Sequence, residues 1–316
     1  MRRVLACLFL CLSFSAAAQQ YPGRTVRMVV GFAPGGGTDI IGRLVAQKLG
    51  ERWGQPVVVD NRPGASGNIG AELVARAAPD GYTLLMAFSS HASNPALSKL
   101  SFDVAKDFSA ISLVASGPAV VIAHPSVPGK SLAGVIAHAK ANPGAVKYGS
   151  SGVGTPVHLA GELMQQMTGA QMVHVPYKGI APAMTAILAG DIQITYATPL
   201  SALGQLKAGK LIGLAVAAPA RFPSLPDVPT AAEAGLAGYD VDFWYALLGP
   251  AGMPAALVDR IQKDLAAVLT TPEMKDSLLA QGCVAVAGPP AELNALIARD
   301  HDKWTKVVKT GGVKVE

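Results

Sequence analysis

Cysteine is scarce in this chain of 316 residues, which contains three in all. Cys7 and Cys11 lie within the first eighteen residues, so Cys283 stands alone in the rest of the sequence and cannot form an intrachain disulfide there. Charged residues are also few, at 15%, and Lys and Arg form no run of the kind that binds nucleic acid. We therefore expect the chain to depend on an apolar core and to have no nucleic-acid partner.

The motifs of common enzymes and metal sites are missing as well. No GxSxG nucleophile elbow, HExxH zinc motif or GxxxxGK[ST] phosphate-binding loop occurs. The segment HLAGE at 158–162 lacks the second histidine of such a zinc site, and Cys283 has no histidine nearby in sequence, which favours a buried structural thiol. The motifs thus support no metal, cofactor or catalytic residue, although a hydrolase is unsupported rather than excluded.

The first eighteen residues have the composition of a secretory signal peptide. Arg2 and Arg3 precede a twelve-residue apolar run at 4–15, which is too short to span a bilayer, and the alanines at 16–18 suit a signal peptidase. We expect cleavage after Ala18 and export to the periplasm; the alternative is an uncleaved anchor. Cleavage removes two of the 26 basic residues and none of the 21 acidic ones, which leaves a net charge of +3.

The rest of the chain alternates between two periodicities. From residue 24 onward, short β-branched segments alternate with segments of helical period, which predicts an α/β fold with mostly parallel sheets. The length allows two compact domains. Strands are expected at 25–32, 56–60 and 82–88, then at 119–124, 145–151, 171–177, 191–197 and 211–218.

Two segments, 108–116 and 243–250, are the expected crossings between two lobes, and a pair of crossings makes a hinge. Helices near 254–270, 272–281 and 290–309, with a short strand at 283–287, follow the second sheet and are expected to cover the first. The predicted division is a first lobe from 19–115, a second lobe from 116–243 and a return to the first lobe from 244–316.

Ligands of open α/β sheets bind at the carboxyl ends of the strands, so the strand-to-helix loops are the candidate sites. The first loop, 32–39, has three successive glycines before a helix, whose free amides suit an anion. The alternative is a tight turn with Asp39 as a helix cap. The candidate residues of this loop are Phe32, Ala33, Gly36, Gly37, Thr38 and Asp39.

A second loop of the same kind, at 149–159, again places hydroxyls and glycines between a strand and a helix. The alternative is an ordinary cap and chain reversal. A third loop follows the strand at 82–88, and it suits either hydrogen bonds to a ligand or an ordinary turn. The candidates in these loops are Ser150, Ser151, Gly152, Gly154, Thr155 and His158, then Ser89, Ser90 and His91, with Tyr177 as a wall of the pocket.

Long segments of the sequence resemble one family in order: 21–49, 54–86, SSGVGTPVHLAGELM at 150–164, VHVPYKG at 173–179, LPDVPTAAEAGL at 225–236 and LLGPAGMP at 247–254. They resemble the extracytoplasmic solute receptors of the tripartite tricarboxylate transporter system, also called Bug proteins. The resemblance implies a type II periplasmic-binding-protein fold, with two lobes that close on a small carboxylate. It also implies a monomer without cofactor or catalysis that delivers its ligand to a membrane permease.

By the same resemblance, the family's binding loops match residues 32–39, the named residues of 150–158 and the stretch 176–179. One departure concerns Ala197 and the following Thr198, where many relatives carry Asp in place of the alanine. If that Asp contacts an ammonium group, its loss argues against an amino-acid ligand. Two alternatives remain open: a sensor that docks on a membrane histidine kinase, and a secreted α/β enzyme, which would consume its ligand.

Overall fold

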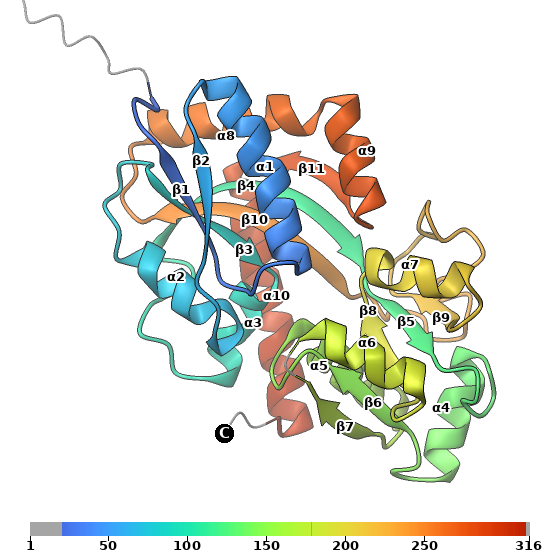
Figure 1. Cartoon of the computed structure of the whole chain (residues 1–316). Helices are drawn as coiled ribbons and strands as arrows, with labels where there is room; N and C mark the ends of the chain where they lie inside the picture. The colour runs from blue at the N-terminus through green and yellow to red at the C-terminus, as the bar shows by residue number, and fades with distance from the viewer. Residues whose placement is uncertain (1–20, 178, 314–316) are drawn as a thin grey trace, which may run out of the picture.

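The computed structural model describes residues 21–177 and 179–313, and Figure 1 shows the chain folded around two separate sheets. The first sheet has the strand order β11-β4-β10-β3-β1-β2. Strands β1, β2 and β3 are parallel, and β10 is antiparallel to both of its neighbours. Its members are β1 (Val26–Val30), β2 (Val57–Asn61), β3 (Thr83–Phe88), β4 (Phe108–Pro118), β10 (Asp242–Pro250) and β11 (Val284–Gly288).

The second sheet has the order β7-β6-β8-β5-β9. Strand β6 is parallel to β7 and β8, whereas β5 is antiparallel to β8 and β9. Its members are β5 (Val120–Ala123), β6 (Lys147–Ser150), β7 (Val173–Pro176), β8 (Ile194–Ala197) and β9 (Ile212–Val216). The predicted α/β fold with two lobes, each a mixed sheet flanked by helices, is confirmed. The expectation of mostly parallel strands is wrong, because β4, β5 and β10, which connect the two sheets, pair antiparallel with their neighbours. Each sheet with its helices is called the first or the second lobe below.

In the described part of the chain, ten α-helices connect and cover the strands. They are α1 (Gly37–Trp53), α2 (Asn68–Ala75), α3 (Ser90–Leu97), α4 (Leu132–Ala141), α5 (Pro156–Thr168), α6 (Ile180–Ala189), α7 (Pro199–Lys207), α8 (Ala255–Leu269), α9 (Pro272–Ala280) and α10 (Pro290–Gly311). The segment expected as the third loop is helical from Ser90. Serine, asparagine and the internal Pro95 are weak helix formers, so the sequence pattern concealed α3.

Successive side chains of a strand point to opposite faces of the first sheet, and helices cover both of these faces. On β10, Tyr245 and Leu247 pack into one core with α1, α8 and α9, whereas Trp244 and Leu248 pack on the other face with α2 and α10. A strand with both faces buried reads as a continuous apolar run, and DFWYALLGP is one. Among the described residues, no helix is long and apolar enough to cross a membrane.

The two lobes are joined where β4 continues into β5 and where the chain returns into β10. Backbone hydrogen bonds of Ala119, Ala217 and Val241 to one another tie these connections together. Helix α10, coloured red in Figure 1, packs on α3 and β4 of the first lobe and on α5 of the second. The amide of Gln166 on α5 donates to the carbonyl of Val307 on α10 at 2.7 Å, so this helix contacts both lobes.

Candidate ligand-binding site

The first candidate loop connects β1 to α1, and the end of α1 that carries Gly37 lies on the side of the second lobe in Figure 1. Helix α1 has Gly36 as its N-cap, without a side-chain cap, so its first amides are free to bind an anion. A Cβ placed on Gly37 would lie 2.8 Å from the hydroxyl of Tyr245. Glycine at position 37 therefore allows that hydroxyl to reach the start of the helix.

Asp39 is a structural part of this loop rather than a free acceptor. Its buried carboxylate accepts hydrogen bonds at 2.9 Å from the amide of Gly35, the side-chain amide of Asn61 and the guanidinium of Arg43. Burial raises the pKa of Asp39, but these hydrogen bonds outweigh it and lower the pKa below its usual value. The ionised carboxylate holds Gly35 and so shapes the glycine loop, which leaves the helix amides to face a ligand.

Two hydroxyls lie at the same end of the first sheet. That of Ser89, directly after β3, is buried without a hydrogen-bond partner within the described ranges, and that of Tyr245 on β10 lies beside the start of α1. Tyr245 pairs in register with Phe88, so both hydroxyls come from neighbouring strands. Buried polar groups are nearly always satisfied, so the hydroxyl of Ser89 is one that a polar ligand could satisfy. The sequence indicated Ser89 but missed Tyr245.

An aromatic wall borders these hydroxyls. Phe88 lies between Phe32, Tyr245 and Phe243, with ring centroids 5.2–5.9 Å apart. Phe32 and Phe88 are half-buried. A cavity of about 10 Å³ beside them is lined in part by Ser66 and Asn94, and it has room for one water molecule at most. The wall can contact the carbon chain of a ligand whose charged end meets the α1 amides.

Ser90 and His91 lie on α3, where their polar groups are occupied by the protein. The hydroxyl of Ser90 donates to the carbonyl of Ser66 at 3.0 Å. His91 is buried against the Phe108 ring, and its Nε2 lies 3.2 Å from the carbonyl of Val104. Burial lowers the pKa of His91 to about 4. The structure thus uses both residues in the packing of the first lobe.

The second candidate loop runs from Ser150, at the end of β6, to Thr155, the N-cap of α5. The hydroxyl of Thr155 donates to the carbonyl of Gly152 at 2.8 Å and accepts from the amide of His158. The hydroxyl of Ser150 accepts from the amide of Gly152 at 3.1 Å. Both hydroxyls therefore fix the loop, whereas Ser151 is partly exposed beside them.

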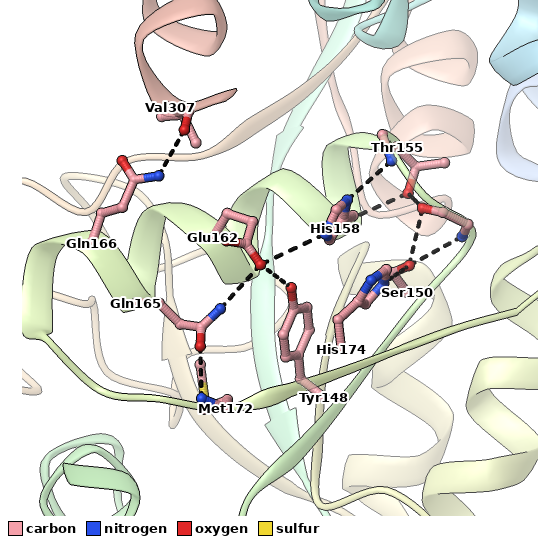
Figure 2. Close-up of polar contacts among 12 residues, drawn as sticks. Tyr148, Ser150, Thr155, His158, Glu162, Gln165, Gln166, Met172, His174 and Val307 are labelled. Carbon is pink, nitrogen blue, oxygen red and sulfur yellow. Dashed lines mark hydrogen bonds and ion pairs between the residues drawn. The ribbon is translucent and has the colours of Figure 1, made fainter. Parts of the chain in front are cut away.

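Gly152 and Gly154 have φ angles of 132° and 77°, a conformation that side chains with a Cβ rarely adopt. Beneath them lies a polar cluster, drawn in Figure 2, that no motif in the sequence indicated as a unit. The amide of Gly154 donates to Nδ1 of His158 at 3.0 Å, and the hydroxyl of Ser150 lies 2.6 Å from Nε2 of His174. Two histidines therefore bind the loop, His174 at Ser150 and His158 at Gly154.

Glu162 and Tyr148 complete this cluster. The hydroxyl of Tyr148 donates to Oε1 of Glu162 at 2.6 Å, and Nε2 of His158 faces the same oxygen at 3.6 Å. Burial raises the pKa of Glu162, but these two partners outweigh it and lower the pKa. The spacing of His158 and Glu162, four residues apart on one helix, was the only signal in the sequence; the strand residues are brought together by the β6–β7 register.

The remaining candidates lie at the ends of β7 and β8. The amide of Tyr177 donates to the carbonyl of Ser150, and its half-buried ring lies near Gly149. Thr198 is the N-cap of α7, and its hydroxyl accepts from the amide of Ser201. Ala197 is fully buried in an apolar cluster of the second lobe. Lys178, within the stretch 176–179, lies outside the described residues.

The arrangement as a whole can hold an anion without a cationic side chain. None of the eighteen candidates is Lys or Arg. The first lobe supplies free helix amides, the hydroxyls of Ser89 and Tyr245 and an aromatic wall; the second supplies a glycine loop above a polar cluster. Within the described ranges, no three His, Cys, Asp or Glu side chains are grouped as a metal site would require.

Known proteins match the chain along nearly its whole length. Residues 41–313 match the family model described as "Tripartite tricarboxylate transporter family receptor". The protein BugT of Bordetella pertussis is 34% identical over 303 residues, which is 95% of this chain and 93% of that protein.

Three solved structures share the fold. Rpa4515 of R. palustris, solved with adipate, is 35% identical with a TM-score of 0.86, and the match covers 93% of this chain and 99% of that one. The periplasmic binding protein BugD is 32% identical with a TM-score of 0.83, covering 94% and 100%. MatC from Rhodopseudomonas palustris, with bound malate, is 31% identical with a TM-score of 0.83, covering 91% and 100%.

Proposed function

Because this chain belongs to the tripartite tricarboxylate transporter family of receptors, we propose that it captures a small carboxylate between its lobes in the periplasm and delivers it to a membrane permease. The family consists of receptors rather than enzymes, so the ligand is released unchanged. The observation that carries the proposal is the free start of α1, which lies beside the hydroxyl of Tyr245 and at the same end of the sheet as Ser89, whose buried hydroxyl has no partner within the described residues.

The chemistry of relatives supports a carboxylate as the ligand. Rpa4515 and MatC are at least 31% identical to this chain, and their structures hold adipate and malate. Both ligands are dicarboxylates of a size that helix amides and hydroxyls can grip at each end. The wall of Phe32 and Phe88 favours an acid with an apolar carbon chain, such as adipate.

Closure of the lobes is the proposed mechanism of capture. A ligand shifts a protein toward a closed state only by the difference between its affinities for the closed and open states, so it must touch both lobes when they are closed. The loop at 32–39 would supply one end of the grip and the loop at 150–155 the other. We take the lobes as 19–115 with 244–316, and 116–243, with hinges at the two crossings.

Export is part of the same proposal. The expected signal peptide at residues 1–18 lies outside the described residues, and the relative BugD, a periplasmic binding protein, supports export to the periplasm. Cleavage after Ala18 would release a receptor that diffuses between its ligand and the permease. The permease itself is proposed from family membership alone.

The test is a calorimetric titration of the mature protein with adipate and with adipamide, its neutral analogue of the same length. We expect one adipate to bind per chain and to be recovered unchanged, and adipamide to bind at least tenfold more weakly, because hydrogen bonds to a charged group contribute about 1.5–3 kcal/mol. Malate serves as the second acid. Equal binding of adipate and adipamide would contradict carboxylate capture, and conversion of the acid would indicate an enzyme.

A further inference from the structure

The polar cluster beneath the second-lobe loop consists of Tyr148, Ser150, His158, Glu162 and His174 (Figure 2). We infer that His158 is a positioning residue for ligand capture, and that its neutral imidazole holds the loop at 150–155 in the shape that binds. His158 is only 5% exposed, so it acts through the loop rather than as a ligand contact. This inference rests on the proposed function, because it concerns the same site.

The position of one proton follows from the backbone. An amide N–H can only donate, and that of Gly154 lies 3.0 Å from Nδ1 of His158. This nitrogen must therefore be unprotonated, and a neutral imidazole then carries its proton on Nε2. That N–H faces Oε1 of Glu162 at 3.6 Å, close enough for electrostatic attraction but too far for a full hydrogen bond.

Glu162 selects this tautomer. Its carboxylate accepts from the hydroxyl of Tyr148 and from the side-chain amide of Gln165, at 2.6 and 3.0 Å. A carboxylate with these donors stays ionised, and it favours the imidazole form that presents an N–H to it. The same hydrogen bonds fix its position on α5, so Nδ1 of His158 remains directed at the loop.

His174 supports the other end of the loop. Its ring stacks on that of His158, with centroids 3.8 Å apart and an interplanar angle of 12°. Burial lowers the pKa of His174 to about 4, with the adjacent His158 as a further cause, so this imidazole is neutral at physiological pH. Its Nε2 shares a 2.6 Å hydrogen bond with Ser150, whose hydroxyl in turn binds the amide of Gly152.

Two substitutions separate positioning from simple structural damage. In His158→Asn, the amide oxygen can take the place of Nδ1, accept from Gly154 and remain unprotonated. In His158→Ala, the buried amide of Gly154 loses its acceptor. At pH 8 we expect His158→Ala to bind adipate about tenfold more weakly than the wild type, since a buried donor left unpaired is costly, and His158→Asn to bind within about threefold.

Hydrogen exchange needs no ligand, so it separates a failure of this inference from a failure of the proposed function. Hydrogen exchange at the amide of Gly154 should be slow in the wild type and in His158→Asn at pH 8, and at least tenfold faster in His158→Ala. Unchanged exchange in folded His158→Ala, or equal adipate affinity in all three proteins, would overturn the inference alone. Failure of the wild type to bind adipate, malate or any other acid would overturn the proposed function instead, while the exchange rate still decides whether His158 holds the loop.

Discussion

Neighbouring serines at the end of β3 differ in their hydrogen bonds, although the sequence gives them the same character. The hydroxyl of Ser89 is buried without a partner among the residues that the structure describes, whereas that of Ser90 donates to Ser66. A hydroxyl that is unsatisfied within the protein is available to a ligand, and one that is satisfied is part of the fold. The two positions can therefore be separated by experiment.

Replacement of Ser89 by alanine should weaken ligand binding without loss of stability. The change removes a buried hydroxyl that has no partner among the described residues, so the midpoint temperature of thermal unfolding should be unchanged or slightly raised. Adipate affinity should fall about tenfold, as expected for one hydrogen bond to a carboxylate. The measurements are calorimetric titration and a thermal unfolding curve of the same preparation.

Ser90→Ala is the matched control for that substitution. It leaves the carbonyl of Ser66 without this donor, so the free energy of unfolding should fall by about 1 kcal/mol. Its affinity for adipate should stay near that of the wild type. The interpretation of the two hydroxyls would be wrong if Ser90→Ala lost affinity and Ser89→Ala kept it.

Among the secondary-structure elements, the strands and long helices could be predicted because their periodicity is strong. TVRMVVGF contains β1, and the apolar positions of α1, such as Ile41, Val45 and Leu49, lie in one core. The helix α3 could not be predicted, because its residues favour turns and its stability comes from packing against α10. Contacts with other elements, rather than the local sequence, make this segment helical.

The candidate site also contains residues that the sequence could predict and residues that it could not. Residues at strand ends could be predicted from topology alone, since the carboxyl ends of parallel strands meet at one edge. Tyr245 and His174 could not, because each comes to the site through strand register with a partner distant in sequence. The sequence also could not show that the hydroxyls of Ser150 and Thr155 are engaged in the loop itself.

Strand β10, which carries the chain back into the first lobe, contains Asp242, whose carboxyl group has a raised pKa. Burial raises the pKa of Asp242 to about 6, and the negative charges of Asp240 and Asp300 add to the rise. The folded protein therefore binds more protons than the unfolded chain between about pH 4 and pH 6. Protein stability is expected to fall as the pH rises through this range on account of this group.

Asp242→Asn should remove that contribution. Relative to the variant, the wild type should lose about 2 kcal/mol of unfolding free energy between pH 4 and pH 7, from a shift of about two units. Urea unfolding at these two pH values measures the difference. Parallel pH profiles for the two proteins would show that Asp242 is not the group concerned.

The whole molecule consists of two lobes joined by two crossings and by α10. Trp244 of β10 donates to buried Asp300 of α10 at 2.7 Å, and Gln166 of α5 donates to Val307 of the same helix. Helix α10 thus contacts both lobes beside the hinge segments. Trp304 and Val307 of this helix are buried in the core of the second lobe, so a rotation about the crossings would have to adjust the contacts of α10 with one of the two lobes.

The most direct test of the proposed capture is a distance between the lobes with and without the acid. Spin labels on cysteines introduced at Gln47 of α1 and Lys140 of α4, both exposed, would report it, since the native Cys283 is buried. Addition of adipate should shift the distance distribution to a single, shorter population, and adipamide should leave it unchanged. An unchanged distribution at saturating adipate would contradict capture between the lobes.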